Sequence, residues 1–220
     1  MTYIVTGHYG SGKTEFCVNL AKEIAGSGVG VTIADLDVIN PYFRSREKAD
    51  ELEAQGITVM GDSLGNNTGQ DLPAVSYAFL SRVRRGENVI IDLAGGLDGL
   101  KLMASCYDAI KSIGYEFLCV LNLFRKDTSD VAKMVDFVCG VNRVSKIPVT
   151  GLVNNGHMLR DTTPEHVLVS QAAVLEAAWE LKIPVKYTMI SRDIYEEISD
   201  KIKSERVLIF DKLAMREDWQ

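Results

Sequence analysis

The chain has 220 residues, of which 46% are hydrophobic and 25% charged, so it carries enough apolar surface for a folded core. With 18 glycines and 5 prolines, its composition is unlike that of collagen, a low-complexity linker or a long disordered tail. A net charge of -6, from 24 Lys and Arg against 30 Asp and Glu, argues against a nonspecific nucleic-acid surface.

The first residues lack the basic and apolar regions of a signal peptide, and no uncharged apolar stretch reaches the roughly 18 residues of a membrane span. We therefore expect a cytoplasmic protein without a membrane partner. The four cysteines form no CxxC pair, which excludes a zinc ribbon or a thioredoxin-type motif. Free thiols are expected in that compartment.

Short β-branched runs alternate with longer helical patterns, which is typical of a parallel sheet covered by helices on both faces. The predicted strands cover residues 3–6, 31–34, 57–60, 88–92, 117–122, 149–153 and 185–189. The predicted helices cover residues 13–25, 72–84, about 128–141, 164–181 and about 192–203. No linker divides the sequence, so we predict one domain over residues 1–220. Its class is α/β, three-layered and Rossmann-like, with seven or so mostly parallel strands.

Helix starts are predicted from N-cap residues. Thr163 precedes a proline at the first helical position, Asp127 or Thr128 caps the helix before it, and Ser191 caps the one after it. The last segment, residues 206–220, mixes apolar residues with balanced charges. A membrane-surface helix normally has a basic polar face. Docking of this segment against the domain or a sister subunit is therefore favoured.

The most specific motif is GHYGSGKT at residues 7–14, which fits G-x-x-x-x-G-K-[ST] between a predicted strand and helix. Its glycines let the backbone wrap phosphates, and the helix N-terminus adds partial positive charge. Lys13 would neutralise the β and γ oxygens, and Thr14 would hold Mg²⁺ through its hydroxyl. The predicted nucleotide contacts are Gly7, His8, Tyr9, Gly10, Ser11, Gly12, Lys13, Thr14 and Glu15.

Acidic residues close two further strands. Asp92 ends the apolar run NVIID, and Asp35 and Asp37 lie in TIADLDVINP. Because open α/β sheets bind ligands at the carboxyl ends of their strands, we predict that Asp92 and Asp37 join Thr14 in the magnesium site. Of the pair Asp35 and Asp37, one carboxylate would orient water and the other brace the loop; we assign catalysis to Asp37, with Lys13 and Asp92. The turn after Asp92 offers the backbone N–H of Gly95 to a γ-phosphate.

Together these motifs resemble the MinD/ParA branch of P-loop NTPases, which includes the nucleotide-binding domain of cobyrinate amidases, dethiobiotin synthetase and the nitrogenase iron protein. The resemblance implies ATP and Mg²⁺ as ligands, with switch segments over residues 38–47 and 92–97. It also implies that an asparagine after a late strand reads the adenine. TGLVNN offers Asn155, with Asn154 as the second choice. No N-K-x-D guanine signature stands there, which favours ATP over GTP.

Two positions depart from that family. Its loop has a lysine that crosses to the partner's phosphates where this chain has His8, and a glycine where it has Tyr9. A nucleotide-sandwich homodimer is therefore only a hypothesis.

Arg44 and Arg46 follow the second strand and are candidates to bind a protein partner or a small anionic substrate. We expect a similar cluster, Arg125, Lys126 and Asp127 after the next strand, to border the same ligand crevice.

Three functions are compatible with these residues. The favoured one is a Mg²⁺-dependent ATPase that acts as a nucleotide-dependent switch. The second is a small-molecule kinase or ligase resembling dethiobiotin synthetase, which would transfer phosphoryl to a carboxylate. The third is an ATP-binding regulator that does not hydrolyse its ligand.

Overall fold

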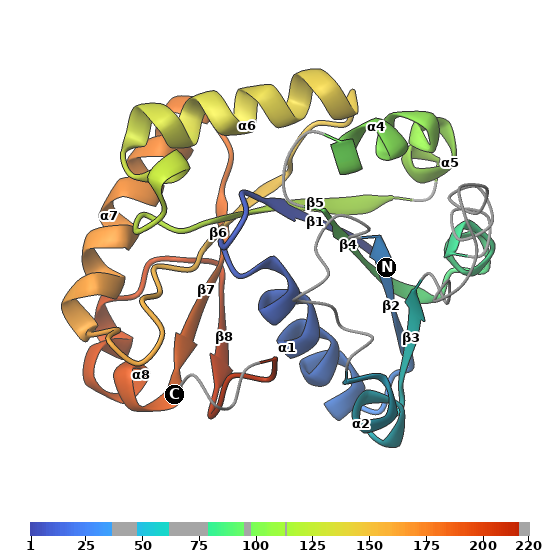
Figure 1. The fold of residues 1–220 in the computed structure, drawn as a ribbon, viewed down its shortest axis with the longest axis horizontal. Helices are drawn as coiled ribbons and strands as arrows, with labels where there is room; N and C mark the ends of the chain where they lie inside the picture. The colour runs from blue at the N-terminus through green and yellow to red at the C-terminus, as the bar shows by residue number, and fades with distance from the viewer. Residues whose placement is uncertain (37–47, 62–78, 95–97, 113, 216–220) are drawn as a thin grey trace.

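The computed structural model describes residues 1–36, 48–61, 79–94, 98–112 and 114–215. Within them, eight parallel strands form one sheet in the order β3-β2-β4-β1-β5-β6-β7-β8 (Figure 1). The strands are β1 (Thr2–Gly7), β2 (Val31–Leu36), β3 (Ile57–Gly61), β4 (Asn88–Leu93), β5 (Tyr115–Leu121), β6 (Gly151–Asn154), β7 (Val185–Ser191) and β8 (Arg206–Phe210). The strand that leads into the glycine loop, β1, therefore lies inside the sheet between β4 and β5.

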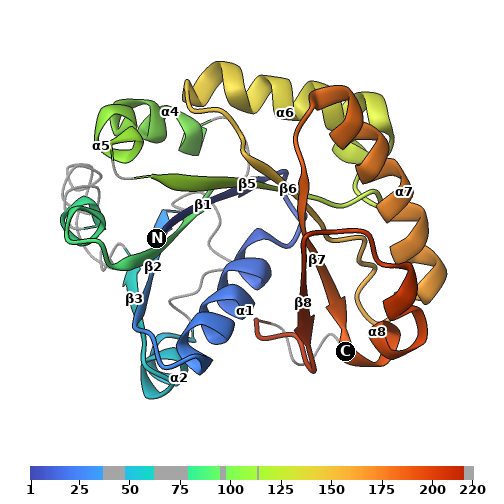
Figure 2. The same cartoon turned by 180° about the vertical axis from the view of Figure 1, so that it is seen from behind.

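Helices cover both faces of the sheet (Figures 1 and 2). One face carries α1 (Lys13–Gly26) and α2 (Ala49–Ala54). The other carries α4 (Asp98–Ser105), α5 (Tyr107–Lys111), α6 (Val131–Ser145) and α7 (Pro164–Leu181), and α8 (Arg192–Ile198) packs against α7 and β7. Residues 79–84 are also helical, and η2 (Lys126–Thr128) and η3 (Ser199–Lys201) are 3-10 turns. The predicted three-layer α/β class is confirmed.

The central strands are apolar because both of their faces are covered. Ile4 and Val5 of β1 are fully buried and, as neighbours on a strand, point to opposite faces. Ile4 belongs to the core beneath α4 to α7, together with Phe117 and Met134, whereas Val5 packs with Phe16 of α1. Burying a side chain of this size contributes about 1.5–3 kcal/mol. The two cores thus hold the sheet and the loops at its carboxyl edge in place.

The C-terminal region, for which the sequence suggested either a membrane-surface helix or docking against the domain, does not begin with a helix. Residues 206–210 form β8, an edge strand parallel to β7, so a helix there is wrong and the strand count is eight. The next described residues, including Leu213 and Met215, pack into the core on the α1 side. Docking against the domain is therefore confirmed for the described part of this segment.

Two helix boundaries also differ from the prediction. The helix α6 begins after Asp130, whose side chain accepts a hydrogen bond from Lys133 N at 2.8 Å, while Asp127 and Thr128 lie in the preceding 3-10 turn. The helix α8 ends at Ile198, earlier than expected. Among the described helices, none is long and apolar enough to cross a membrane.

The start of α7 is as predicted. The Thr163 hydroxyl accepts a hydrogen bond from His166 N at 3.3 Å, and His166 Nδ1 accepts one from Thr163 N at 3.2 Å, with Pro164 at the first helical position. Side-chain caps of this kind satisfy backbone groups that the helix itself leaves without partners. The cap fixes the point at which the loop between β6 and α7 enters the helix, and residues of this loop line a cavity.

Candidate functional site

The loop between β1 and α1 is shaped by its glycines. Gly10 and Gly12 have φ angles of +73° and +88°, in the left-handed region that other residues rarely adopt. At Gly7, a Cβ would lie 2.5 Å from Ser11 Oγ and 2.6 Å from the carbonyl oxygen of Val120 on β5. The loop therefore turns tightly over the carboxyl ends of β1 and β5 and leads directly into α1.

The residues after the loop are buried beside two carboxylates. Lys13 and Thr14 begin α1 and are each 6% exposed. Asp35 of β2 and Asp92 of β4 are buried and paired in register on neighbouring strands, so they face the same side of the sheet. Burial raises the pKa of the Cys17 thiol on α1 well above its usual value, the nearby Asp92 carboxylate raises it further, and Lys13 opposes the rise. This edge thus gathers a cation and two carboxylates at the start of α1.

The donor set fits a magnesium ion that arrives with phosphates. Mg²⁺ is usually bound through one or two protein oxygen ligands, with phosphate and water oxygens completing its shell. The Thr14 hydroxyl and the Asp92 carboxylate are of the type that would supply such ligands, and Asp35 adds a second carboxylate beside Asp92. The other predicted positions lie outside the described residues: Asp37, Arg44, Arg46, Gly95 and the switch residues 38–47 and 95–97.

A second loop, after β5, braces the glycine loop. Arg125 donates a hydrogen bond from Nε to the carbonyl oxygen of Gly10 at 2.8 Å, which confirms that this cluster borders the same crevice. Asp127 Oδ2 lies 3.3 Å from His8 Nδ1. The His8 ring also packs edge-on against Phe137 of α6, with ring centroids 5.5 Å apart. The side chain at the position of the family's lysine is therefore held by its own chain.

Of the two candidate asparagines, Asn155 lies at the loop. Its Nδ2 donates to the carbonyl oxygen of Ser11 at 2.8 Å, and its buried Oδ1 has no hydrogen-bond partner among the described residues. Asn154 is directed elsewhere, because its Oδ1 accepts a hydrogen bond from Ser170 of α7 at 2.8 Å. Tyr9, at the tip of the loop, is 63% exposed. A direct contact between Asn155 and a base stays a prediction, since its amide is engaged with the loop.

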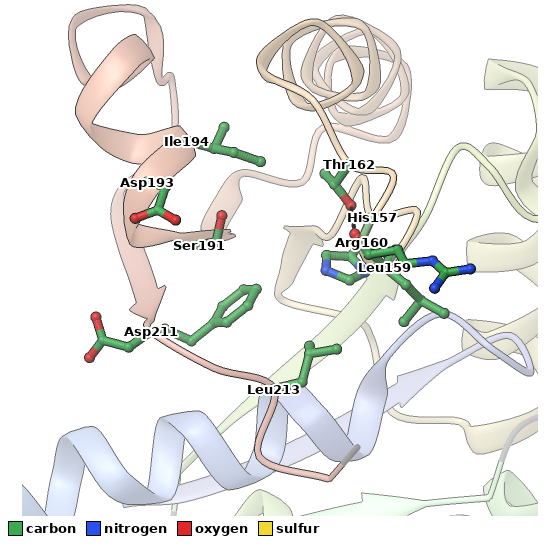
Figure 3. A pocket seen from close by; sticks show the side chains of 10 residues that line it. His157, Leu159, Arg160, Thr162, Ser191, Asp193, Ile194, Asp211 and Leu213 are labelled. Atoms are coloured by element: carbon green, nitrogen blue, oxygen red, sulfur yellow. Dashed lines mark hydrogen bonds between the residues drawn. The ribbon is translucent and has the colours of Figure 1, made fainter. Parts of the chain in front are cut away.

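A cavity of about 370 Å³ opens where β6, β7 and β8 end (Figure 3). Its lining residues come from three segments that each follow the carboxyl end of a strand: His157, Leu159, Arg160, Thr162, Ser191, Asp193, Ile194, Phe210, Asp211 and Leu213. Figure 3 shows Ser191, Asp193 and Ile194 across the cavity from His157 and Thr162. The volume and the mixture of apolar and polar walls are typical of small-molecule sites.

A short stretch of chain links the cavity to the glycine loop, because His157 is two residues beyond Asn155, which bonds to Ser11. None of the residues that line the cavity belongs to a recognised sequence motif, so the sequence does not predict a ligand role for them. The only sequence feature that they share is that each lies at or after the carboxyl end of a strand, where α/β sheets bind ligands. Glu15, the remaining predicted nucleotide contact, is 6% exposed, and its carboxylate bonds to the C-terminal segment next to Leu213.

His157 is expected to make the stability of the fold depend on pH. Burial, aided by the charge of Arg125, lowers the pKa of His157 to about 4, and its Nδ1 accepts a hydrogen bond from Leu159 N at 2.9 Å. The ordinary value is about 6.5, so between these two pH values only the unfolded chain takes up the proton. The free energy of unfolding therefore does not depend on the titration of His157 above about pH 6.5. It decreases as the pH falls from there toward 4, by at most about 1.4 kcal/mol per pH unit.

The measurement is urea unfolding between pH 4 and pH 7 for the wild type and for His157→Asn, whose side-chain oxygen can accept the same local hydrogen bond. The variant is expected to lose less stability than the wild type as the pH falls. Identical pH profiles for the two proteins would show that His157 does not titrate in this way.

The sheet order, the glycine loop and the buried Lys13 and Thr14 define the fold of this chain as that of a P-loop NTPase. No family model and no curated protein matches the sequence. Solved structures match it in fold. The cell division protein FtsY from Thermotoga maritima is 24% identical with a TM-score of 0.57, over 86% of this chain and 60% of that one.

Two other FtsY structures give similar values. FtsY from Mycoplasma mycoides is 20% identical with a TM-score of 0.59, over 84% of this chain and 58% of that one. Chloroplast FtsY from Physcomitrella patens is 22% identical with a TM-score of 0.57, over 85% and 57%. The match thus spans less than two thirds of these longer proteins. At such identities the likeness shows the fold alone.

Proposed function

We propose that this chain is a Mg²⁺-dependent ATPase of the MinD/ParA branch that acts as a nucleotide-dependent switch. The observation that carries the proposal is the loop itself: Gly10 and Gly12 in left-handed conformations, followed by buried Lys13 and Thr14 at the start of α1. Such a loop presents backbone N–H groups, the positive end of a helix and an ammonium to one anion. A nucleoside triphosphate is the ligand that matches all three.

Each residue of the site has a distinct task in this proposal. Lys13 would neutralise the β- and γ-phosphate oxygens, and Thr14 and Asp92 would hold the magnesium ion. When bound, that ion supplies positive charge where the terminal phosphate leaves. Arg125 fixes the outer rim of the loop through Gly10 O. Asp37 orients the attacking water.

In this proposal the base of the nucleotide occupies the cavity near the loop. Leu159, Ile194 and Phe210 offer apolar surface to a planar ring, and Ser191 and Asp193 offer polar groups to its edge. We favour adenine because no N-K-x-D sequence follows β6, where the family's base-reading asparagine stands. The nucleotide would then span from the glycine loop to the ends of β7 and β8.

The test is calorimetric titration of the full chain with ATP, GTP and tripolyphosphate in the presence of Mg²⁺, followed by an assay of phosphate release. We expect ATP to bind more tightly than GTP by about tenfold, which corresponds to roughly one net hydrogen bond. Tighter GTP binding would overturn the adenine assignment and leave the P-loop function standing. Failure of all three ligands to bind would overturn the function itself.

The proposed switch has a second readout, the solution mass by sedimentation with Mg·ATP, with Mg·ADP and without nucleotide. A dimer formed only with ATP would support an ATP-dependent homodimer in spite of His8. An unchanged mass would limit any switch to the single chain.

A further inference from the structure

The carboxylate of Glu15 joins the helix of the glycine loop to the far end of the sequence. Glu15 directly follows Thr14 and is 6% exposed. Its Oε1 accepts a hydrogen bond from Ala214 N at 2.6 Å, and its Oε2 accepts one from Met215 N at 3.0 Å. Asn19, one turn along α1, donates to the same Oε1 at 2.8 Å. Three donors thus converge on one buried carboxylate.

The residues held in this way directly follow a residue of the cavity wall. Leu213, which precedes Ala214, lines the cavity together with Phe210 and Asp211. Leu213, Ala214 and Met215 are buried on the α1 side of the sheet. At the other end of this wall, Asp211 Oδ1 accepts a hydrogen bond from Arg192 Nε of α8 at 2.5 Å. The wall is therefore tied at both ends, to α8 and to α1.

Glu15 is chemically suited to this contact because an ionised carboxylate offers acceptors on both oxygens. A glutamine of the same shape has one acceptor and one donor, so one of the two backbone N–H groups would face another donor. Both N–H groups belong to buried residues, and a buried donor without an acceptor is costly. A charge-assisted bond near the first turn of a helix is also favoured by the helix dipole.

We propose that Glu15 is a positioning residue for the base end of the nucleotide, because by holding Ala214 and Met215 it fixes the neighbouring Leu213 in the cavity wall. This inference rests on the proposed function. Glu15 stands directly after Lys13 and Thr14, so one turn of α1 would bind the phosphates through two residues and shape the base pocket through the third. Loss of its carboxylate should weaken the binding of a nucleotide. It should not weaken the binding of tripolyphosphate, which has no base.

The experiment measures the dissociation constants of Mg·ATP and of Mg·tripolyphosphate for the full chain by calorimetry. Glu15→Gln is expected to weaken ATP binding by about tenfold and to leave tripolyphosphate binding within about twofold of the wild type. Leu213→Ala removes wall surface while keeping the Glu15 carboxylate, and it is expected to change the affinities in the same selective way. Glu23→Gln is the matched control on the same helix, since Glu23 pairs with Arg206 at the exposed start of β8, and it should change neither constant.

The outcomes separate the inference from the function on which it rests. Equal losses of ATP and tripolyphosphate binding in Glu15→Gln would place its effect on the loop and overturn the inference, as would unchanged ATP binding. If Glu15→Gln does not fold, Leu213→Ala decides: a selective loss of ATP affinity supports the inference, and an equal or absent loss overturns it. A wild type that binds neither ligand would instead refute the P-loop function.

Discussion

Replacement of Lys13 by alanine is expected to weaken the binding of Mg·ATP and of Mg·tripolyphosphate in parallel, each by about 10- to 100-fold. Lys13 is 6% exposed, so its ammonium is largely shielded from water where the phosphates would lie. Hydrogen bonds to charged groups contribute about 1.5–3 kcal/mol, which corresponds to this range of affinity. Because the lost contact is to phosphate, the loss of affinity should be the same for the ligand with a base and the ligand without one. Calorimetry with both ligands measures it.

The matched control is Lys22→Ala on the same helix. Lys22 is 31% exposed in its side chain and lies 3.9 Å from Glu51, so it shares the charge and the helix of Lys13 without its burial at the loop. This variant should bind both ligands as the wild type does. Full affinity in a correctly folded Lys13→Ala protein would contradict the assignment of the loop. A loss restricted to ATP would move Lys13 to the base end of the site.

The parts of the site that could be predicted are those that lie close together in sequence. The glycine loop, Lys13 and Thr14 fall within one motif between one strand and one helix, so spacing alone identifies them. Asp92 is recognisable because it closes an uninterrupted apolar run, and a buried run implies a sheet covered on both faces. That Asp35 stands beside Asp92 requires the pairing of β2 with β4, which no local pattern specifies.

The contacts that complete the site join residues far apart in the chain. Glu15 bonds to Ala214, and Arg125 bonds to Gly10, in each case through a backbone group that any residue would provide. Sequence patterns report side chains, so a backbone partner leaves no trace in them. The cavity was unpredictable for a related reason: its walls come from three separate strand ends, and only the fold brings them together.

The errors in the fold have equally local causes. The run from Val207 to Phe210 is too short for its period to separate a strand from a helix, and its pairing with β7 decides the matter. The start of α6 was misplaced because Asp127, Thr128 and Asp130 are all able N-cap residues. Thr128 is engaged elsewhere, since its hydroxyl donates to Asn122 O at 2.6 Å, and only Asp130 has Lys133 N within reach.

Replacement of Gly12 by alanine is expected to disrupt the glycine loop through both its backbone and a collision. Gly12 has a φ of +88°, and a Cβ there would lie 2.2 Å from Asn155 Nδ2. The strained backbone alone costs about 1–3 kcal/mol, and displacement of Asn155 would also break its bond to Ser11 O. We expect a stability loss of at least that size in urea unfolding, with ATP affinity reduced about tenfold or more. Gly26→Ala is the control, because no atom lies within 4 Å of its Cβ position.

The double variant Gly12→Ala with Asn155→Ala separates the two costs. Asn155 supplies both heavy atoms found within 4 Å of the added Cβ, so its truncation removes the collision and leaves the left-handed backbone unchanged. Gly12→Ala should therefore cost less stability in the Asn155→Ala background than in the wild type, and the two substitutions should be non-additive. Additive costs would mean that Asn155 does not press on the loop.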